Sequence, residues 1–545
     1  MKTRTYKTLL FFFGIILSLF ADTSCKNNSL NPPDSEVSTH GIIPLPKQLD
    51  FTGEKLNVSQ NFILVKNNSF NIAFGAVEEL FSNSLEYYKV SDSFSSGDES
   101  LQFIADNSIG NNAYELIINS TGIQIKAGNE EGAFLAVQSL KQYFWHLTNG
   151  QKQTSVELPG IRIFDEPKYE WRGFHVDVSR HMFTKEYIFK IIDWLSYYKF
   201  NKLHLHLTDD QGWRLESKKF PLLNEIGSWR TFDTYDSICI QKAKSDPDFN
   251  IDPRFIQTKN GKTMYGGFYS NNEITEIVNY AKIHFIEIIP EIDMPGHMSA
   301  AIKGYPFLSC IGSSGWGTEF SYPICPCTDE VYEFVFGVYD EISELFPSAY
   351  IHIGADEVEK ATWKQSEDCK DFMKKNNLTN VKEIQSYFVE KLQKHLENKG
   401  KTVIAWDDVT DGKMDSNLKI MYWRDWVKDA PDKAAANGNK IIFTRWDLFY
   451  LSGEYSDENF RKLFEFDIQK EYSKEVVNKI IGFQGCVWTE EIPSEAVFET
   501  YIFPRLQALS EVNWSGTKDW NSFSQRLAVH IDFLNSKRVN LKYYP

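Results

Sequence analysis

The chain has 545 residues, of which 42% are hydrophobic and 15% aromatic, and its formal net charge is −16 at pH 7. This length exceeds one ordinary domain and permits a large core. Nucleic-acid binding needs a basic stripe to contact phosphates, and the acidic sequence has none, so nucleic acid is excluded as an expected partner. Many of the 14 Trp, 26 Tyr and 41 Phe residues are expected to lie in the hydrophobic core. Their flat faces are also suited to stacking on sugar rings.

Residues 1–25 have the pattern of an export signal. Three basic residues precede an apolar stretch from Leu9 to Phe20, which is too short for a permanent membrane span. Cys25 lies where a bacterial lipoprotein is cleaved and lipidated, but the preceding residues match that signal poorly, so an ordinary secretory signal is the alternative. Residues 26–40 follow as a polar tether. We expect an exported protein in the periplasm or an outer membrane lipoprotein, touching membrane only through a lipid at Cys25.

Six further cysteines are few for this length. Export permits disulfides, and Cys310 is a candidate partner for Cys325 or Cys327, a choice that the sequence leaves open. The segment from Cys325 to Cys327 lacks two more ligands nearby, so we do not expect a metal there.

Residues 41–165 predict a compact α+β domain. The segments 114–118 and 122–126 alternate apolar and polar residues across a short turn, which indicates a hairpin. Residues 131–144 place apolar side chains near helical spacing, which predicts an amphipathic helix.

Residues 166–545 alternate strands with helices. Eight apolar strand candidates are Phe174–Val178, Lys202–Leu207, Phe285–Ile289, Tyr350–Ile353, Thr402–Ala405, Lys419–Tyr422, Ile441–Thr444 and Ile481–Val487. Helix candidates between them are Lys185–Tyr198, Asn272–His284, Val331–Phe346 and Glu383–Asn398. The pattern predicts an α/β fold, a (β/α)8 TIM barrel preceded by the small α+β domain. Residues 224–270 lack a strong period and are expected to form a long loop on the barrel rim.

Two adjacent carboxylates, Asp356 and Glu357, follow the apolar run 349–353. Barrel enzymes do their chemistry at the C-terminal ends of the strands. Paired carboxylates are the working groups of glycoside hydrolysis, in which one donates a proton and the other manages a developing positive charge. A solvated acidic turn is the alternative for such a pair taken alone.

Polar and aromatic residues follow the other predicted strands. They include Asp177, Arg180, Asp209, Asp210, the segment 291–297, Trp406, Trp423 and the segment 488–490. Because strand ends of a barrel meet at one mouth, we expect a single pocket lined by these residues. Stacking faces, bidentate hydrogen bonds and an acid are what a sugar site needs.

Several of these residues have other interpretations. Trp406 and Trp423 could belong to the core, and Asp209 could cap a turn. His204 and His206 lie on one face of a strand, so they also allow a metal site. That site would take its other ligands from Asp209, His297 and Asp356.

Six ordered motifs run from residue 171 to residue 511. They are WRGFHVDVSRH (171–181), NKLHLHLTDDQGW (201–213), EIDMPGH (291–297), HIGADE (352–357), QGCVWTE (484–490) and FPRLQALSE (503–511). Together they resemble the motifs of glycoside hydrolase family 20, the β-N-acetylhexosaminidases. The resemblance covers nearly everything from about residue 41 onward, including a small N-terminal domain typical of that family.

The resemblance implies exo-acting removal of terminal β-linked GlcNAc or GalNAc with retention, without a metal, a cofactor or an enzyme nucleophile. The 2-acetamido oxygen of the substrate attacks C1 and forms an oxazolinium intermediate. Glu357 is then expected to protonate the glycosidic oxygen and later to activate water. Asp356 is expected to accept the acetamide N–H and to stabilise the positive charge.

The same resemblance implies how the sugar is held. Arg180 would fork onto O3 and O4, and Glu490 would accept from O4 or O6. The remaining expected contacts are Trp406, Trp423 and Trp488 as walls, Tyr450 as a donor to the acetamide oxygen, Asp209 and His297 as orienting groups, and His206 and Asp293 in support. A non-catalytic glycan-binding lipoprotein is the rival interpretation, and the intact pair of acids argues against it.

One position departs from the family pattern. The seventh strand is usually followed by Tyr-x-Asp, whose Asp binds O6, but here Ser452 follows Tyr450 at that spacing. Loss of this carboxylate removes repulsion towards an anionic substituent, and Arg424 or Arg445 could attract one. We therefore hypothesise that 6-O-sulfated GlcNAc, as found on mucin-type glycans, is accepted. If the loop is aligned differently, Asp447 takes the place of that Asp and binds O6.

Overall fold

The computed structural model describes residues 40–95, 97–259 and 261–542, so the expected leader, Cys25 and nearly all of the tether lie outside the described residues. From His40 onward the chain forms one compact unit. Within the described ranges, no helix has both the length and the apolar content to cross a bilayer.

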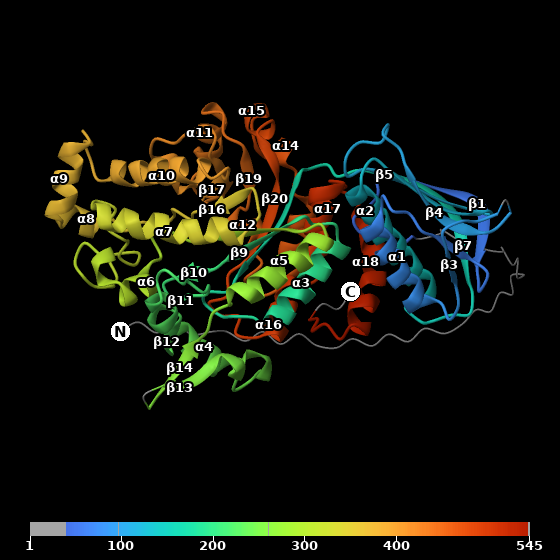
Figure 1. Ribbon diagram of the computed structural model, residues 1–545, viewed down its shortest axis with the longest axis horizontal. Coiled ribbons are helices and arrows are strands. Elements are labelled where there is room, and N and C mark those ends of the chain that lie inside the picture. Colours follow the sequence, from blue (N-terminus) through green and yellow to red (C-terminus); the bar gives the residue numbers. More distant parts are fainter. Residues whose placement is uncertain (1–39, 96, 260, 543–545) are drawn as a thin grey trace, which may run out of the picture. The chain divides into compact units, whose positions relative to one another are not determined.

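The N-terminal part is a seven-stranded sheet with two helices (Figure 1). Its strands are β1 (Gln48–Val58), β2 (Ile63–Val65), β3 (Lys89–Ser91), β4 (Ser100–Ala105), β5 (Tyr114–Asn119), β6 (Gly122–Ala127) and β7 (Val156–Asp165), in the order β1-β7-β5-β6-β4-β2-β3. Its helices are α1 (Asn71–Ser84) and α2 (Glu130–Thr148). The predicted hairpin is present as the antiparallel pair β5 and β6, and α2 contains the predicted helix.

Eight parallel strands close the barrel. They are β8 (Trp171–Asp177), β9 (Lys202–His206), β15 (Glu287–Glu291), β16 (Tyr350–His352), β17 (Thr402–Trp406), β18 (Lys419–Tyr422), β19 (Ile441–Phe443) and β20 (Ile480–Val487). The predicted barrel is confirmed, and each predicted strand has its counterpart. The third strand begins at Glu287 instead of Phe285, because Phe285 has a φ of 55° and still belongs to the turn that ends the preceding helix.

The four predicted helices between strands are α3 (Lys185–Tyr197), α5 (Asn271–Ile283), α7 (Asp329–Leu345) and α10 (Lys382–Glu397). Thr184, Ser270 and Thr328 cap the first three by accepting a backbone N–H. Further helices are α6 (Ser299–Gly304), α8 (Ala361–Gln365), α9 (Glu367–Lys375), α11 (Ala430–Ala436), α12 (Trp446–Phe449), α13 (Asp457–Glu465), α14 (Ile468–Glu471), α15 (Lys474–Val477), α16 (Glu495–Ile502), α17 (Arg505–Trp514) and α18 (Trp520–Ser536). Residues of the helices and strands share one large hydrophobic core.

The expectation of an irregular rim loop over 224–270 is wrong. This segment holds a π-helix (Leu223–Gly227), α4 (Thr234–Lys242), two short 3-10 helices and the antiparallel sheet of β12 (Trp229–Thr231), β13 (Ile256–Lys259) and β14 (Lys262–Gly266), which Figure 1 shows in green. A small core containing Cys239 and Tyr265 and a buried ion pair between Arg230 and Asp236 hold it together. The helix and strands of this segment are largely exposed, so the sequence shows no periodic hydrophobic pattern that would reveal them.

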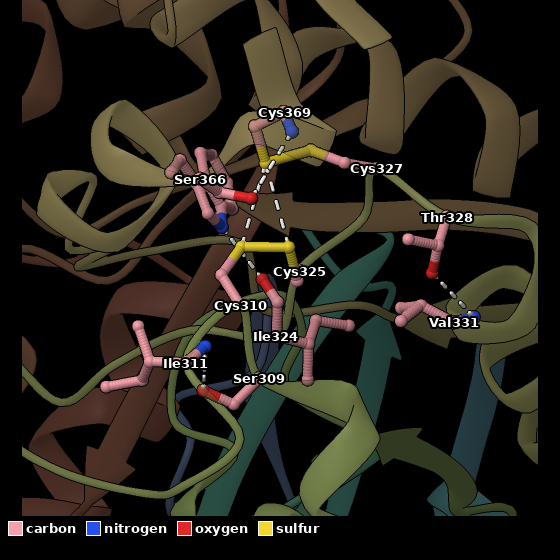
Figure 2. Close-up of a disulfide and its surroundings, with 11 residues drawn as sticks. Ser309, Cys310, Ile311, Ile324, Cys325, Cys327, Thr328, Val331, Ser366 and Cys369 are labelled. Atoms are coloured by element: carbon pink, nitrogen blue, oxygen red, sulfur yellow. Dashed lines mark hydrogen bonds between the residues drawn. A yellow bond between two sulfur atoms is a disulfide. The ribbon is translucent and has the colours of Figure 1, made fainter. Parts of the chain in front are cut away.

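Two disulfides lie side by side beyond the third and fourth barrel strands (Figure 2). Cys310 pairs with Cys325, which settles the choice that the sequence left open, and Cys327 pairs with Cys369 of α9. Among the described cysteines, Cys239 and Cys486 are free and buried. The disulfide between Cys310 and Cys325 closes a loop within the segment that follows β15, and the disulfide between Cys327 and Cys369 fastens this segment to the one that follows β16.

Candidate active site

The two predicted acids lie in a tight turn directly after β16. Gly354, Ala355 and Glu357 have φ angles of 68°, 74° and 51°, a left-handed conformation that is uncommon for residues with a side chain and marks functional sites. A Cβ atom on Gly354 would lie 1.7 Å from Oδ1 of Asp293, so only glycine fits there. The backbone N–H of Ala355 donates to the same Asp293 oxygen at 3.1 Å, and that of Glu357 donates to Asp408 at 3.3 Å. The turn is therefore held from both neighbouring strands.

The two acids differ in environment. The Asp356 side chain is 10% exposed, whereas that of Glu357 is 30% exposed. Burial raises the pKa of Asp356 well above its usual range, and the nearby Asp293 carboxyl raises it further. Burial raises the pKa of Asp293 as well. Oδ1 of Asp356 and Oδ2 of Asp293 are buried without a hydrogen-bond donor among the described residues, as expected for two carboxyl groups that share one proton.

His297 connects the more exposed acid to a second group of charges. Its Nε2 lies 3.4 Å from Oε2 of Glu357, and its Nδ1 lies 3.2 Å from Oδ1 of Asp209. Burial opposes a charge on His297, but Asp209 and the other carboxylates outweigh it and raise the pKa of His297 well above its usual range. These carboxylates therefore favour the cationic form of the imidazole beside Glu357, and Asp209 keeps the ring in place.

Arg180 lies where β8, β10 (Thr208–Asp209) and β20 end. Its guanidinium contacts Oδ2 of Asp209 at 2.7 Å and Oδ2 of Asp177 at 3.1 Å, and it lies 3.8 Å from Oε1 of Glu490. It also lies over the Trp488 ring, 5.1 Å from the centroid. Burial opposes the charge, but these carboxylates outweigh it and raise the pKa of Arg180. The structure thus brings residues from opposite ends of the barrel sequence together.

Four predicted aromatic residues form one continuous wall. The Trp406 and Trp488 centroids are 5.9 Å apart, those of Tyr450 and Trp488 are 6.1 Å apart, and Tyr450 stacks on Trp423 at 6.2 Å. The indole N–H of Trp423 donates to Oδ2 of Asp408 at 2.9 Å. Burial and the neighbouring carboxylate of Asp407 raise the pKa of Asp408 to about 7. The wall is therefore connected to the turn that carries the acids.

Glu291 lies at the centre of the barrel below the wall. Its carboxylate accepts from the indole N–H of Trp406 at 2.8 Å and contacts Nδ1 of His206 at 2.7 Å, Nε2 of His204 at 3.0 Å and Nδ1 of His352 at 3.0 Å. Nε2 of His206 then reaches Oδ2 of Asp209 at 2.9 Å. The two histidines of the metal alternative thus contact a common carboxylate.

Glu291 was expected at the pocket only as the first residue of the segment 291–297, His352 was only part of a motif, and Asp408 was not predicted. Glu291 and His352 end β15 and β16, and inward-facing residues of a barrel strand recur with period two, so their positions carried a signal. Asp408 follows β17 by two residues, and no spacing rule connects it to Trp423 or to Glu357. Its contacts exist only because the strands close into a barrel.

Ser452 and the two arginines of the sulfate hypothesis are all engaged. Oγ of Ser452 accepts the backbone N–H of Trp488 at 2.6 Å. Arg424 pairs with Asp407 at 2.8 Å. Arg445 pairs with Asp447 at 2.6 Å and also contacts a glutamate of α14. Neither guanidinium therefore offers an unpaired charge to an anion.

Most of the barrel region matches a known family. Residues 169–517 match the glycosyl hydrolase family 20 catalytic domain, and residues 39–166 match domain 2 of the same family. The chain belongs to glycoside hydrolase family 20. The resemblance drawn from the six motifs is thereby confirmed.

Individual relatives in family 20 come from several bacteria. A β-hexosaminidase of Porphyromonas gingivalis is 30% identical over 549 residues, which are 94% of this chain and 65% of that protein. A β-hexosaminidase of Akkermansia muciniphila is 28% identical over 463 residues, 81% of this chain and 88% of that protein. The chain therefore spans slightly less than two thirds of the Porphyromonas gingivalis relative.

A solved family 20 structure shares the fold. The exo β-N-acetylglucosaminidase of Vibrio harveyi, in complex with N-acetylglucosamine, has a TM-score of 0.78 at 28% identity and covers 93% of this chain and 78% of that chain. The site combines an acid that is 30% exposed and lies beside His297 with a buried pair of carboxyl groups. Chemically, Glu357 can deliver a proton to a group in the opening, and Asp356 can accept a hydrogen bond from a neutral amide beneath it.

Proposed function

We propose that the protein is an exo-acting β-N-acetylhexosaminidase that removes terminal β-linked GlcNAc or GalNAc from glycans. The observation that carries this proposal is the division of environment between the adjacent acids. Asp356 is buried against Asp293, while Glu357 reaches the opening 3.4 Å from His297. One carboxyl is thus placed to hold a neutral group, and the other to exchange a proton with solvent-accessible atoms.

The reaction proceeds in two steps without an enzyme nucleophile. In the first, the acetamide oxygen of the substrate bonds to C1 as the C1–O bond to the leaving group breaks, and Glu357 gives its proton to that oxygen. Asp356 accepts the acetamide N–H and stabilises the positive charge on the oxazolinium ring. In the second, the Glu357 carboxylate takes a proton from water, whose oxygen attacks C1 and reopens the ring. The anomeric configuration is retained.

Other residues of the site bind the sugar in this proposal. Arg180 donates to O3 and O4, and Glu490 accepts from O4 or O6. Tyr450 donates to the acetamide oxygen, and the three Trp rings enclose the pyranose. Asp209 and His297 orient Glu357, because His297 contacts both carboxylates.

We propose that the pocket tolerates 6-O-sulfated GlcNAc without preferring it. Ser452 stands where the family pattern has a carboxylate, so repulsion from that position is absent. Arg424 and Arg445 are each neutralised by carboxylate partners, so attraction is weak. The plain sugar is expected to be the better substrate.

We also propose that the protein is exported and held at the outer membrane or in the periplasm, on the basis of the sequence pattern of residues 1–25. Cell fractionation of the native protein beside a Cys25→Ser variant tests this. Release of the variant alone into the soluble fraction supports a lipid anchor, and identical soluble fractions contradict it.

The test of the activity is hydrolysis of 4-nitrophenyl β-GlcNAc beside its 6-O-sulfated counterpart, at equal concentrations, with and without a strong chelator. Faster release from the plain sugar, unchanged by the chelator, is the expected result. Faster release from the sulfated sugar would show preference in place of tolerance. Loss of activity with the chelator would favour the metal alternative of His204 and His206. No release from either sugar would favour the non-catalytic glycan-binding lipoprotein.

A further inference from the structure

Two large aromatic side chains at the barrel mouth are exposed without serving the sugar pocket. Trp426 lies in the turn after β18, Trp446 begins α12 after β19, and each is 57% exposed. Both follow strands whose C-terminal ends carry the pocket wall. Neighbouring exposed apolar side chains can mark a binding surface.

The exposed pair continues the wall of the pocket. The Trp426 ring contacts the Trp423 ring edge to face, with centroids 5.0 Å apart and planes at 89°. The Trp446 ring contacts Trp426 in the same way at 6.4 Å and 77°. The backbone N–H of Trp446 donates to the carbonyl of Trp423 at 2.9 Å. The rings therefore form a series that runs from Tyr450 inside the pocket through Trp423 to the surface.

The series of rings is also connected to Glu357 through Asp408. Trp423 donates its indole N–H to Asp408, and the other oxygen of Asp408 accepts the backbone N–H of Glu357. In the proposed reaction Glu357 protonates the oxygen of the leaving group, so the leaving group departs from this side of the pocket. A saccharide leaving group that extends outward past Trp423 meets Trp426 and Trp446 next.

We propose that Trp426 and Trp446 form a platform that binds the saccharide leaving group, one sugar unit beyond the bond that is cut. The pyranose ring has an apolar face of C–H groups that packs on an indole face, and hydroxyls at its edge remain in water. A platform of this kind selects glycan chains over short glycosides. The proposal rests on the proposed function, because it assigns the leaving-group side of the same site.

The experiment compares two substrates that differ only in the leaving group. The β-1,4-linked GlcNAc disaccharide offers a sugar to the platform, and methyl β-GlcNAc offers none. In the Trp426→Ala/Trp446→Ala variant, the ratio of kcat/KM for the disaccharide to that for the methyl glycoside should fall about tenfold, because truncating a binding-surface tryptophan commonly costs more than a factor of five in affinity. Phe at both positions should restore most of the ratio.

Two further variants separate the platform from indirect effects. Trp446→Ala removes a ring that contacts Trp426, and Trp426 remains in place on Trp423, so the ratio should still fall while the pocket wall keeps its neighbour. Trp316→Ala removes another exposed tryptophan, 60% exposed on the loop closed by Cys310 and Cys325, and should leave the ratio unchanged. An unchanged ratio in the double variant would overturn the platform and leave a docking surface for protein as the alternative.

A binding measurement keeps the two proposals distinguishable. In a Glu357→Gln background, calorimetry should give tighter binding of the disaccharide than of free GlcNAc, and the difference should vanish when Trp426 and Trp446 are replaced by Ala. If the unmodified protein cleaves neither substrate, the proposed function fails, yet this affinity difference still decides the platform. Equal affinities for disaccharide and monosaccharide in the Glu357→Gln protein would overturn the platform even if hydrolysis is observed.

Discussion

At the scale of single residues, the adjacent acids show how one turn yields two chemical roles. The left-handed backbone at Ala355 and Glu357 sends neighbouring side chains to different places. One reaches Asp293 in the buried floor, and the other reaches the opening beside His297. The two carboxyl groups therefore lie in different environments, one buried and one 30% exposed.

The roles of the two acids predict that only the Glu357 variant responds to a change of leaving group. In Glu357→Gln, hydrolysis of methyl β-GlcNAc should fall by about three or more orders of magnitude, because general acid catalysis is lost. Formation of the oxazolinium from a 2,4-dinitrophenyl glycoside should fall far less, because that leaving group departs without a proton. In Asp356→Asn the rates for both substrates should fall by similar factors. Single-turnover kinetics with each substrate measures this, and an equal loss for both in Glu357→Gln would contradict the assignment.

The carboxyl pair predicts a change in pH dependence. Asp356 must be ionised to accept the acetamide N–H, so activity is lost as pH falls through its pKa. Burial raises that pKa and the Asp293 carboxyl raises it further, so Asp293→Asn should lower it and extend activity to lower pH. The acid limb of the kcat/KM profile measures the shift.

The control for this variant is Asp371→Asn, which removes the same charge from an exposed position on α9. Its profile should overlay that of the unmodified protein. An acid limb in Asp293→Asn that stays in place, or that moves to higher pH, would contradict the shared proton.

At the scale of elements, the sequence and the structure agree where a long periodic pattern exists. The barrel strands and the helices α3, α5, α7 and α10 were predictable, because apolar spacing and caps identify them. The segment 224–270 was not predictable, because its three strands are largely polar and exposed and therefore show no apolar run. The site, too, contains residues that the sequence predicted and residues that it did not. Motif residues such as Glu357 were found, whereas Asp408 is defined by its contacts to other strands.

The paired disulfides predict a stabilising clamp on the rim. They close segments with sequence separations of 15 and 42 residues, and loops of such lengths contribute about 3 to 4 kcal/mol each to the free energy of unfolding. Reduction should therefore lower the melting temperature clearly in calorimetry. A variant with all four cysteines changed to Ser should melt lower and should no longer respond to reductant.

The free buried Cys239 provides the control for the clamp. A Cys239→Ser protein should keep the full response to reductant. If reduction leaves the melting temperature of the unmodified protein unchanged, the clamp is refuted.

At the scale of the whole molecule, a buried polar centre joins the N-terminal sheet to the barrel. Asp165 of β7 accepts from Lys199 at 2.8 Å, from Tyr114 at 2.7 Å and from the indole N–H of Trp514 at 2.8 Å. Both Asp165 and Lys199 are fully buried. The sheet and the barrel therefore depend on one another for the satisfaction of buried charges.

This centre predicts a large effect of a substitution far from the acids. Asp165→Ala leaves the Lys199 ammonium buried without its partner, which costs about 3 to 5 kcal/mol. The melting temperature should fall by several degrees in calorimetry. Glu157→Ala, on the same strand, removes an exposed ion pair with Lys55 and should change it little. Equal melting temperatures for the two variants would contradict a joining role for Asp165.

The dependence of hydrolysis on the acetamide group tests the central claim most directly. The kcat/KM values for 4-nitrophenyl β-GlcNAc and for 4-nitrophenyl β-glucoside, which lacks that group, are measured on the same preparation. Because the acetamide oxygen is the proposed nucleophile and Asp356 its holder, the first substrate should be cleaved and the second should show no turnover above background. Comparable cleavage of both sugars would contradict substrate-assisted catalysis, and cleavage of neither would contradict the hexosaminidase assignment itself.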